Sequence, residues 1–159
     1  MDRKNILLEQ LSASHNSNGW FVSFQSAIEG LSPNNANWKE CEGTNSILEI
    51  VNHLNFWNAR YLNRFLGIEN KEMTVENRDT FFGELSWKDA VEEFNTLMCK
   101  WKKVIADCED DKLDSIVPEQ SGTWVSTLTH LCIHNAYHIG QIVSIRKQQG
   151  SWDEKFGVH

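Results

Sequence analysis

Four stretches of the chain repeat apolar residues every three or four positions, which is the spacing of an amphipathic α-helix. They cover about residues 2–31, 46–66, 86–108 and 124–149. No stretch of useful length alternates apolar and polar residues, so we expect no β-sheet. The pattern therefore predicts an all-α protein in which four long helices form a four-helix bundle.

Local signals mark where these helices begin and end. Ser46 with Glu49 matches a capping box, and Gly67 marks the end of the second helix. Ser86 is the expected N-cap of the third helix, and Ser121 or Thr123 is that of the fourth. Gly150 is expected to end the fourth helix. The first helix has a weak point at residues 15–19, where we expect a kink or a break.

The connections differ strongly in length. Residues 67–85 are polar apart from an embedded Phe81 and Phe82. About 18 residues is long for a connection in a bundle, where about 2–8 are usual. We therefore expect a crossover along the bundle between helices 2 and 3, held down by the two phenylalanines. Residues 32–45 and 109–122 are expected to be loops, and Trp152 in the tail is expected to pack back.

The period also assigns faces to the helices. The second helix is expected to turn its apolar seam inward and its asparagines outward, and Trp20 is expected on the inner face of the first helix. The inward seam is Ile47, Ile50, Leu54, Trp57, Tyr61 and Phe65, and the outer face is Asn52, Asn55, Asn58, Asn63 and Arg64.

Length and charge limit the class of protein. With 159 residues, 40 % of them apolar, residues 1–159 are expected to form a single domain with its own core. The formal net charge of −7 and the lack of a long basic cluster argue against nucleic acid as a partner. No run is long enough for a signal peptide or a membrane span, so we expect a cytoplasmic protein. The four cysteines lack CxxC spacing, and Cys99 and Cys132 are expected to be buried, reduced thiols.

Candidate chemistry lies in three histidines. His134 and His138 are four residues apart in the apolar run of the last helix, and such residues lie on one face, one turn apart. His53 lies among the apolar residues of the second helix. Buried imidazoles need partners, and a shared divalent ion provides one. We expect His53, His134 and His138 to bind a metal ion; the alternative is a purely structural, hydrogen-bonded cluster.

Other side chains are expected near this site. His130 diverges from His138 by about 80° around the axis, so it is expected beside the ligands. Tyr137 lies at the pocket edge or in the core, and Gln141 contacts a ligand or holds His138. Trp57 follows His53 by one turn and is expected to line the pocket. His15 is expected at the surface or as a cap, with a fourth-ligand or supporting role as the alternative.

Three neutral ligands leave a divalent ion with its full charge and an open position, as in catalytic sites. A bound water or thiol would lose its proton easily there. The HxxxH spacing lacks the glutamate of HExxH, because Asn135 and Ala136 follow His134. The usual base of a metalloprotease is therefore absent.

Two motifs together resemble the DinB/YfiT-like superfamily. They are NSILEIVNHLxFW at 45–57 and HxxxHxGQI at 134–142. The resemblance implies an up-down-down-up four-helix bundle and a metal triad at His53, His134 and His138. It further implies zinc or nickel, and a metal-dependent hydrolase or an S-transferase that joins a thiol such as bacillithiol or mycothiol to an electrophile. Many relatives have Arg where this chain has Ile139, which weakens the case for an anionic thiol cofactor.

Three functions follow as hypotheses. The leading one is a metal-dependent transferase that activates a low-molecular-weight thiol for attack on a small electrophilic substrate. The second is a hydrolase that uses metal-bound hydroxide, and the third is a non-catalytic, metal-stabilised binding or stress protein. Exposed aromatic residues, among them Trp38, Phe81, Phe82 or Trp152, are expected to support a homodimer.

Overall fold

The structure is a computed structural model that describes residues 2–71 and 74–158, and within these residues it is helical without a strand. The four long helices are α1 (Arg3–His15), α4 (Ile47–Leu66), α5 (Trp87–Asp107) and α7 (Trp124–Gln148). Shorter elements are α2 (Phe24–Ile28), α3 (Pro33–Asn37), α6 (Asp110–Asp114) and the 3-10 turns η1 (Asn77–Phe81) and η2 (Glu154–Phe156). The predicted all-α bundle is confirmed.

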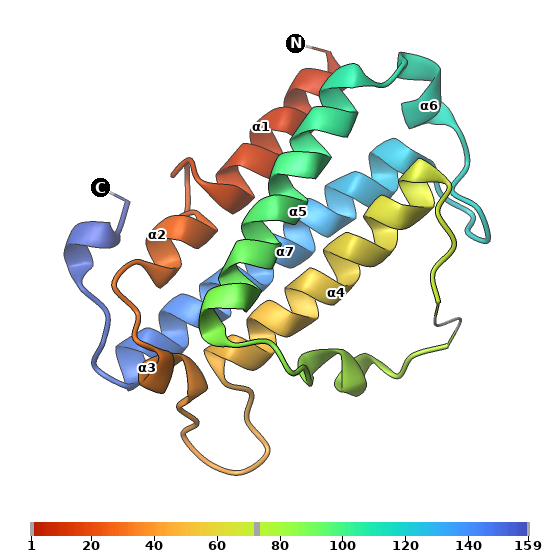
Figure 1. The fold of residues 1–159 in the computed structure, drawn as a ribbon. Helices are drawn as coiled ribbons and strands as arrows, with labels where there is room; N and C mark the ends of the chain where they lie inside the picture. The colour runs from red at the N-terminus through yellow and green to blue at the C-terminus, as the bar shows by residue number, and fades with distance from the viewer. Residues whose placement is uncertain (1, 72–73, 159) are drawn as a thin grey trace.

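The long helices run in the predicted up-down-down-up order. In Figure 1, α1 and α7 run in one direction, and α4 and α5 run in the other. Helix α4 packs against both α5 and α7, and α1 packs against the same two helices. Helices α1 and α4 therefore lie diagonally across the bundle.

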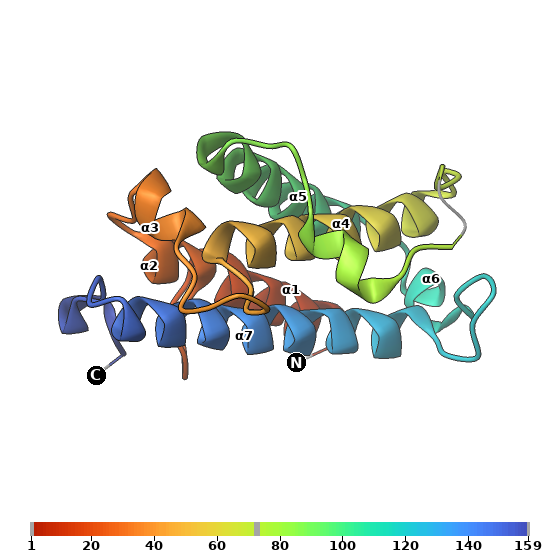
Figure 2. The ribbon, with the colours of Figure 1, turned by 90° about the horizontal axis from the view of Figure 1, so that it is seen from below.

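The parallel direction of α4 and α5 explains the long crossover. Because α4 has 20 residues, it is about 30 Å long, and the chain must return over that distance before α5 can begin. Figure 2 shows the returning segment, with η1 close to both α4 and α7. Two residues of the predicted crossover, 72 and 73, lie outside the described residues.

The predicted boundaries of α4, α5 and α7 are confirmed within a residue or two. Ser46 and Glu49 form the capping box, with Ser46 Oγ accepting from the Glu49 amide at 3.2 Å. Gly67 ends α4 with a φ of 72°, a conformation that glycine adopts at little cost. Ser86 caps α5 and Thr123 caps α7.

The first predicted helix is broken where its sequence is weakest. Helix α1 ends at His15, and α2 begins only at Phe24. Trp20, expected on the inner face, lies in this break and is fully exposed. That expectation was wrong because helical spacing holds only while the helix continues. The expected loops also contain the short helices α3 and α6.

The expected polar face of α4 is wrong in one respect. Asn52, Asn55 and Asn58 are buried rather than exposed. Because α4 is covered by α5, α7 and the crossover, most of its circumference lies against other elements. The buried amides are retained because they find partners, for example Asn55 Nδ2 on the Ala90 carbonyl at 2.9 Å.

Two expectations about single residues fail and one holds. Phe82 is 69 % exposed, so of the two phenylalanines Phe81 alone packs on the bundle. Cys99 is exposed on α5, whereas Cys132 is buried as expected.

Trp38, Phe81 and Trp152 are partly buried, so of the four expected dimer residues only Phe82 is largely free on the surface. A homodimer stays a prediction.

The tail packs back onto the bundle through Arg146 of α7. This buried guanidinium donates to the Ala27 carbonyl and the Ser151 carbonyl, both at 2.7 Å. It also lies 5.4 Å from the ring centroid of Trp152. One side chain thus joins α7, α2 and the tail.

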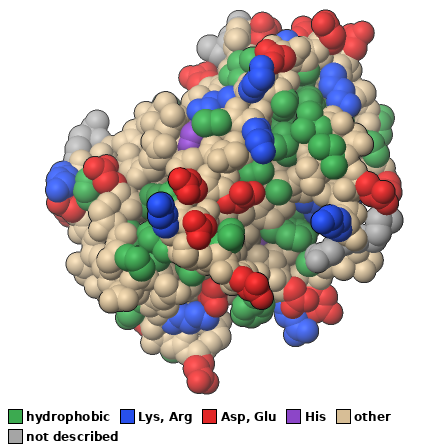
Figure 3. Space-filling model, in the orientation of Figure 1, with side chains coloured by type: hydrophobic (Ala, Val, Ile, Leu, Met, Phe, Trp, Pro, Cys, Tyr) green, Lys and Arg blue, Asp and Glu red, His purple; other side chains and the backbone are tan. Residues whose placement is uncertain are grey.

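On the face in Figure 3, acidic and basic side chains are interspersed and no basic area stands out. Among the described helices, none combines the length and the apolar character that crossing a bilayer requires.

Candidate metal centre

The structure brings His53 of α4 together with His134 and His138 of α7. Their Nε2 atoms converge: His134 Nε2 lies 3.0 Å from that of His53 and 3.1 Å from that of His138. Within the described residues these three form the group of side chains that could hold a metal ion. Residues separated by more than 80 positions therefore lie together, as the predicted metal site requires.

A hydroxyl of the crossover fixes the tautomer of His53. Thr80 Oγ1 donates to the Asn77 carbonyl at 2.6 Å, so its contact with His53 Nδ1, also 2.6 Å, must be one in which it accepts. His53 therefore carries its proton on Nδ1. Its Nε2 presents a lone pair to the other two histidines.

Gln141 does the same for His138. Its amide nitrogen donates to the Tyr137 hydroxyl at 3.1 Å, which leaves Oε1 to accept from His138 Nδ1 at 2.7 Å. His138 Nε2 therefore also carries a lone pair and no proton. Of the two roles considered for Gln141, holding His138 is the one observed.

The converging nitrogens fit a cation. The Nε2 lone pairs of His53 and His138 both face His134 Nε2, at 3.0 and 3.1 Å, and their repulsion is relieved either by an N–H of His134 or by a cation among the three nitrogens. A tetrahedral zinc ion with Zn–N distances of 2.0–2.1 Å separates its nitrogens by about 3.3 Å, close to the separations here. Three neutral imidazoles suit zinc, nickel, copper or iron. The group could thus bind a divalent ion.

The electrostatics keep all three imidazoles neutral at pH 7. Burial lowers the pKa of His53 to about 3, with the neighbouring histidines as further causes, and lowers that of His134 to about 4. Burial also lowers the pKa of His138, against the opposing effect of its bond to Gln141. Neutral imidazole is the form that binds metals, so no proton has to be displaced near neutral pH.

Aromatic rings cover His53. Phe81 stacks on its ring with centroids 4.0 Å apart and an interplanar angle of 12°, and the Trp57 centroid lies at 6.4 Å. Phe81 also approaches His138 at 6.2 Å. The crossover therefore shields the site from water on this side and fixes the ring of one candidate ligand.

A pocket opens beside His134. Its volume is about 430 Å³, and it lies between α4, α7, the crossover and the loop before α7. Trp57 and Tyr61 form apolar walls, and Gln120 donates to the Tyr61 hydroxyl at 3.1 Å. Its other lining residues are Asn77, Thr127, His130, Leu131 and His134. None of these lining residues is an Asp, Glu, Lys or Arg.

The remaining predicted residues are placed as follows. His130 is exposed and lines this pocket, and so does Trp57. Tyr137 is 63 % exposed and touches the His138 ring, with centroids 5.1 Å apart, so it is at the edge rather than in the core. Ile139 is buried in the core.

His15 is not at the surface, contrary to the preferred expectation. It is buried, its Nε2 contacts Asn95 Oδ1 at 2.9 Å, and its Nδ1 contacts Lys102 Nζ at 3.0 Å. Because α1 packs closely on α5, the last residue of α1 is covered. Both ring nitrogens are engaged there, so His15 serves the α1–α5 interface.

Two features of the site were missed from the sequence. Thr80 lies in a connection without periodicity, so no pattern indicated that it would meet His53. Asn58 and Asn135 form a buried amide pair between α4 and α7, next to His134 in the chain. Asn135, in the apolar run of the last helix, was the available signal for that pair, because Asn58 was assigned to the outer face.

Comparison with known proteins assigns the chain to a family. A family model described as the DinB superfamily matches residues 22–142, which is more than half of the chain and includes all three histidines. Searches of curated proteins and of solved structures found no match.

Proposed function

The chain belongs to the DinB superfamily, and from this premise we propose that it is a metal-dependent enzyme that joins a low-molecular-weight thiol to an uncharged electrophile. The observation that carries the proposal is the convergence of three Nε2 atoms beside a pocket. We further propose that His53, His134 and His138 are the metal ligands. Zinc or nickel is the expected ion.

A bound divalent ion would supply Lewis acidity, which lowers the pKa of a water or thiol that contacts it. The protein would hold the imidazoles in the positions that the ion requires. Thr80 and Gln141 hold the imidazoles of His53 and His138 in one orientation, and Phe81 keeps solvent from His53. Two of the three imidazoles are thus held in place before an ion binds, whereas His134 Nδ1 has no hydrogen-bond partner among the described residues.

The pocket beside His134 supports an uncharged substrate. Its walls are aromatic on the α4 side, and its polar lining groups are two amides, two hydroxyls and two imidazoles. A charged substrate would lose its hydration there without gaining an ion pair. Trp57 and Tyr61 would pack against the apolar part of the electrophile.

The lack of a carboxylate in this pocket favours a thiol as nucleophile. A thiol has a pKa near 8.5, so contact with a cation is enough to deprotonate it without a separate base. Hydrolysis of an ester or amide is the second candidate function. His130 supports it, because an exposed imidazole in the same pocket as His134 is placed to move a proton.

The test combines metal content with turnover. Tag-free protein should contain about one zinc or nickel ion per chain by mass spectrometry, and His138→Ala should lose the ion, whereas His15→Gln should keep it. Conjugation of a chromogenic aryl halide to cysteine or bacillithiol should saturate and should disappear in His138→Ala. Hydrolysis of a nitrophenyl ester without added thiol would favour the second candidate. Full activity of metal-free protein would refute both, and bound metal without any turnover would leave a metal-stabilised binding protein.

A further inference from the structure

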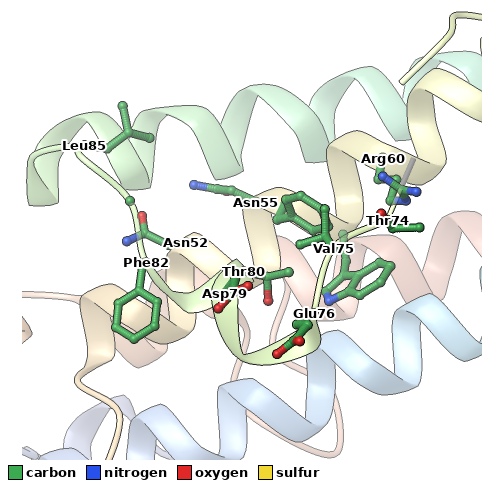
Figure 4. Close-up of a pocket in the computed structure, with 13 residues that line it drawn as sticks. Asn52, Asn55, Arg60, Thr74, Val75, Glu76, Asp79, Thr80, Phe82 and Leu85 are labelled. Carbon is green, nitrogen blue, oxygen red and sulfur yellow. The ribbon is translucent and has the colours of Figure 1, made fainter. Parts of the chain in front are cut away.

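Two pockets share the side chain of Trp57, and they differ in their relation to the histidines. The larger one, of about 1090 Å³, lies between α4 and the crossover, with Glu76 and Asp79 among its lining residues (Figure 4). None of the three histidines lines it, whereas His134 lines the smaller one. The electrophile of the proposed reaction is therefore expected in the smaller pocket.

Tyr61 and Gln120 meet at the end of this smaller pocket that lies away from His134. Gln120 Nε2 is 3.1 Å from the Tyr61 hydroxyl, and both residues line the pocket beside Thr127. Tyr61 follows His53 by eight residues, an axial offset of about 12 Å, and Thr127 precedes His134 by seven, about 10 Å. Because α4 and α7 run in opposite directions, both offsets point the same way. The pair therefore lies about two helical turns from the histidines.

The loop before α7 presents Gln120 through a strained turn. Residues 115–124 form a short hairpin in which the Val117 amide donates to the Gly122 carbonyl at 2.9 Å. The turn closes with the Gln120 amide on the Val117 carbonyl at 3.1 Å, and within it Glu119 has a φ of 64°. Glycine adopts that conformation at little cost, whereas a residue with a Cβ is strained there. Strain of this kind is retained where the fold requires one backbone direction, and here the next residue reaches across to α4.

The Tyr61–Gln120 pair offers a free donor beside a free acceptor. When Gln120 Nε2 donates to the Tyr61 hydroxyl, the hydroxyl proton and Gln120 Oε1 have no other partner among the described residues. If the amide is turned over, its Oε1 accepts from the hydroxyl, and an N–H and a hydroxyl lone pair remain. Both side chains are only partly buried, and Gln120 Oε1 is not among the fully enclosed polar atoms. A ligand can therefore reach both groups.

A carboxamide matches this arrangement with two adjacent atoms. Its carbonyl oxygen accepts from one member of the pair, and its N–H donates to the other. A carboxylate carries acceptors alone, so it would face an acceptor of the pair without a cation in the lining to offset its charge. An ester offers a carbonyl but no N–H, so it makes one of the two bonds.

We propose that Tyr61 and Gln120 recognise a carboxamide on the substrate, held about 10 Å from the metal-binding nitrogens. The inference rests on the proposed transferase function, which places the reacting end of the electrophile at the histidines. With an aryl chloride, the thiolate sulfur bonds to the ring carbon, chloride leaves, and the thiol proton passes to solvent. The pair takes no part in this step and acts through recognition alone.

The first test compares 4-chloro-3-nitrobenzamide with methyl 4-chloro-3-nitrobenzoate, an ester of similar size without the N–H. With zinc-loaded protein and cysteine as the thiol, kcat/KM corrected for the uncatalysed rates should favour the amide about tenfold. Tyr61→Phe and Gln120→Leu should each remove most of this preference. Gln25→Leu on α2, outside the pocket, is the matched control and should keep it. An equal loss with both substrates in the pocket variants would mean a purely structural contact and would overturn the proposal.

A binding measurement separates this inference from the proposed function. 4-Methyl-3-nitrobenzamide has no leaving group, and by calorimetry it should bind about tenfold more tightly than methyl 4-methyl-3-nitrobenzoate. The amide should also shift the indole NMR signal of Trp57, and Gln120→Leu should abolish its advantage. An amide preference in binding without any conjugation would support the recognition site and refute the transferase. Conjugation of both substrates with equal efficiency, or equal affinity of the two analogues, would overturn the role of the pair.

Discussion

Asn58 of α4 and Asn135 of α7 exchange two hydrogen bonds in the centre of the bundle. Asn58 Nδ2 donates to Asn135 Oδ1 at 2.9 Å, and Asn135 Nδ2 donates to Asn58 Oδ1 at 3.2 Å. Both residues are fully buried. Because the pair is reciprocal, it is satisfied at a single offset of the two helices, and the same offset brings His53 to His134.

Removal of one partner should therefore affect both stability and the site. We expect Asn135→Ala to lower the free energy of unfolding by about 1–3 kcal/mol, because the buried Asn58 amide keeps its bond to the Leu54 carbonyl but loses both bonds to α7. Metal affinity should fall as well, since α4 is less well fixed against α7. Urea unfolding and competitive zinc titration with a chelator would measure the two effects.

A double variant separates the two effects. In Asn58→Leu/Asn135→Leu both polar groups are removed, so stability should recover relative to the single variant. If the pair fixes the helix offset, metal affinity should stay low even though stability recovers. Wild-type zinc affinity in the double variant would show that the asparagines do not position the histidines.

Thr80→Val should weaken metal binding without disturbing the bundle. The change removes the acceptor for His53 Nδ1–H, and loss of such a partner costs about 10–100-fold in metal affinity. Thr129→Val is the matched control, because its hydroxyl bonds only its own helix, at the Val125 carbonyl. Equal zinc affinities of the two variants in a chelator competition would contradict the role assigned to Thr80.

The metal-free protein should become less stable as the pH falls below about 6.5. The pKa values of His53 and His134 are lowered to about 3 and about 4 in the folded state, and that of His138 is lowered as well. Between those values and the pKa of about 6.5 in the unfolded chain, the unfolded state binds more protons than the folded state. The free energy of unfolding therefore decreases as the pH decreases. Above pH 6.5 these groups should contribute no slope.

The check is urea unfolding in chelator at pH 7.5, 5.5 and 4.5, with the triple variant His53→Gln/His134→Gln/His138→Gln as the comparison. The triple variant should show a flatter dependence on pH. A residual slope is expected, because burial also lowers the pKa of His15. Identical slopes for the two proteins would contradict the prediction.

Arg146→Met should destabilise the protein by about 2–3 kcal/mol, because two charge-assisted bonds to the carbonyls of Ala27 and Ser151 are lost. The exposed neighbour Lys147→Met on the same helix is the control and should change stability little. Proteolysis of the tail should also accelerate in Arg146→Met alone. A melting temperature equal to that of Lys147→Met would refute this role of Arg146.

Much of the fold could be predicted from the sequence, because helix ends are set by local chemistry. Ser46 with Glu49, Ser86, Thr123 and Gly67 act through bonds to backbone groups within a few residues. Such signals need no knowledge of the tertiary structure. The expectation for Trp20 was wrong because its exposure depends on where α1 ends, and that end is not set by a local signal near Trp20.

The candidate site could be predicted only in part. His134 and His138 follow from helical geometry, and His53 follows from its place in an apolar seam. Thr80 depends on the path of a long crossover, and no local rule fixes that path. The asparagines of α4 were assigned to the outer face because polarity usually indicates exposure; the partner of Asn55 lies in α5 and that of Asn58 in α7.

The crossover is delimited by two self-sufficient signals, the left-handed turn at Gly67 and the N-cap at Ser86. Neither signal depends on the residues between them, so the crossover can change in sequence while the helices on either side keep their ends. The crossover nevertheless provides Thr80, which bonds His53, and Phe81, which stacks on His53. It also lines two pockets. Recombination of crossovers between bundles of this type would therefore alter ligand preference while the helices and the histidines stay the same.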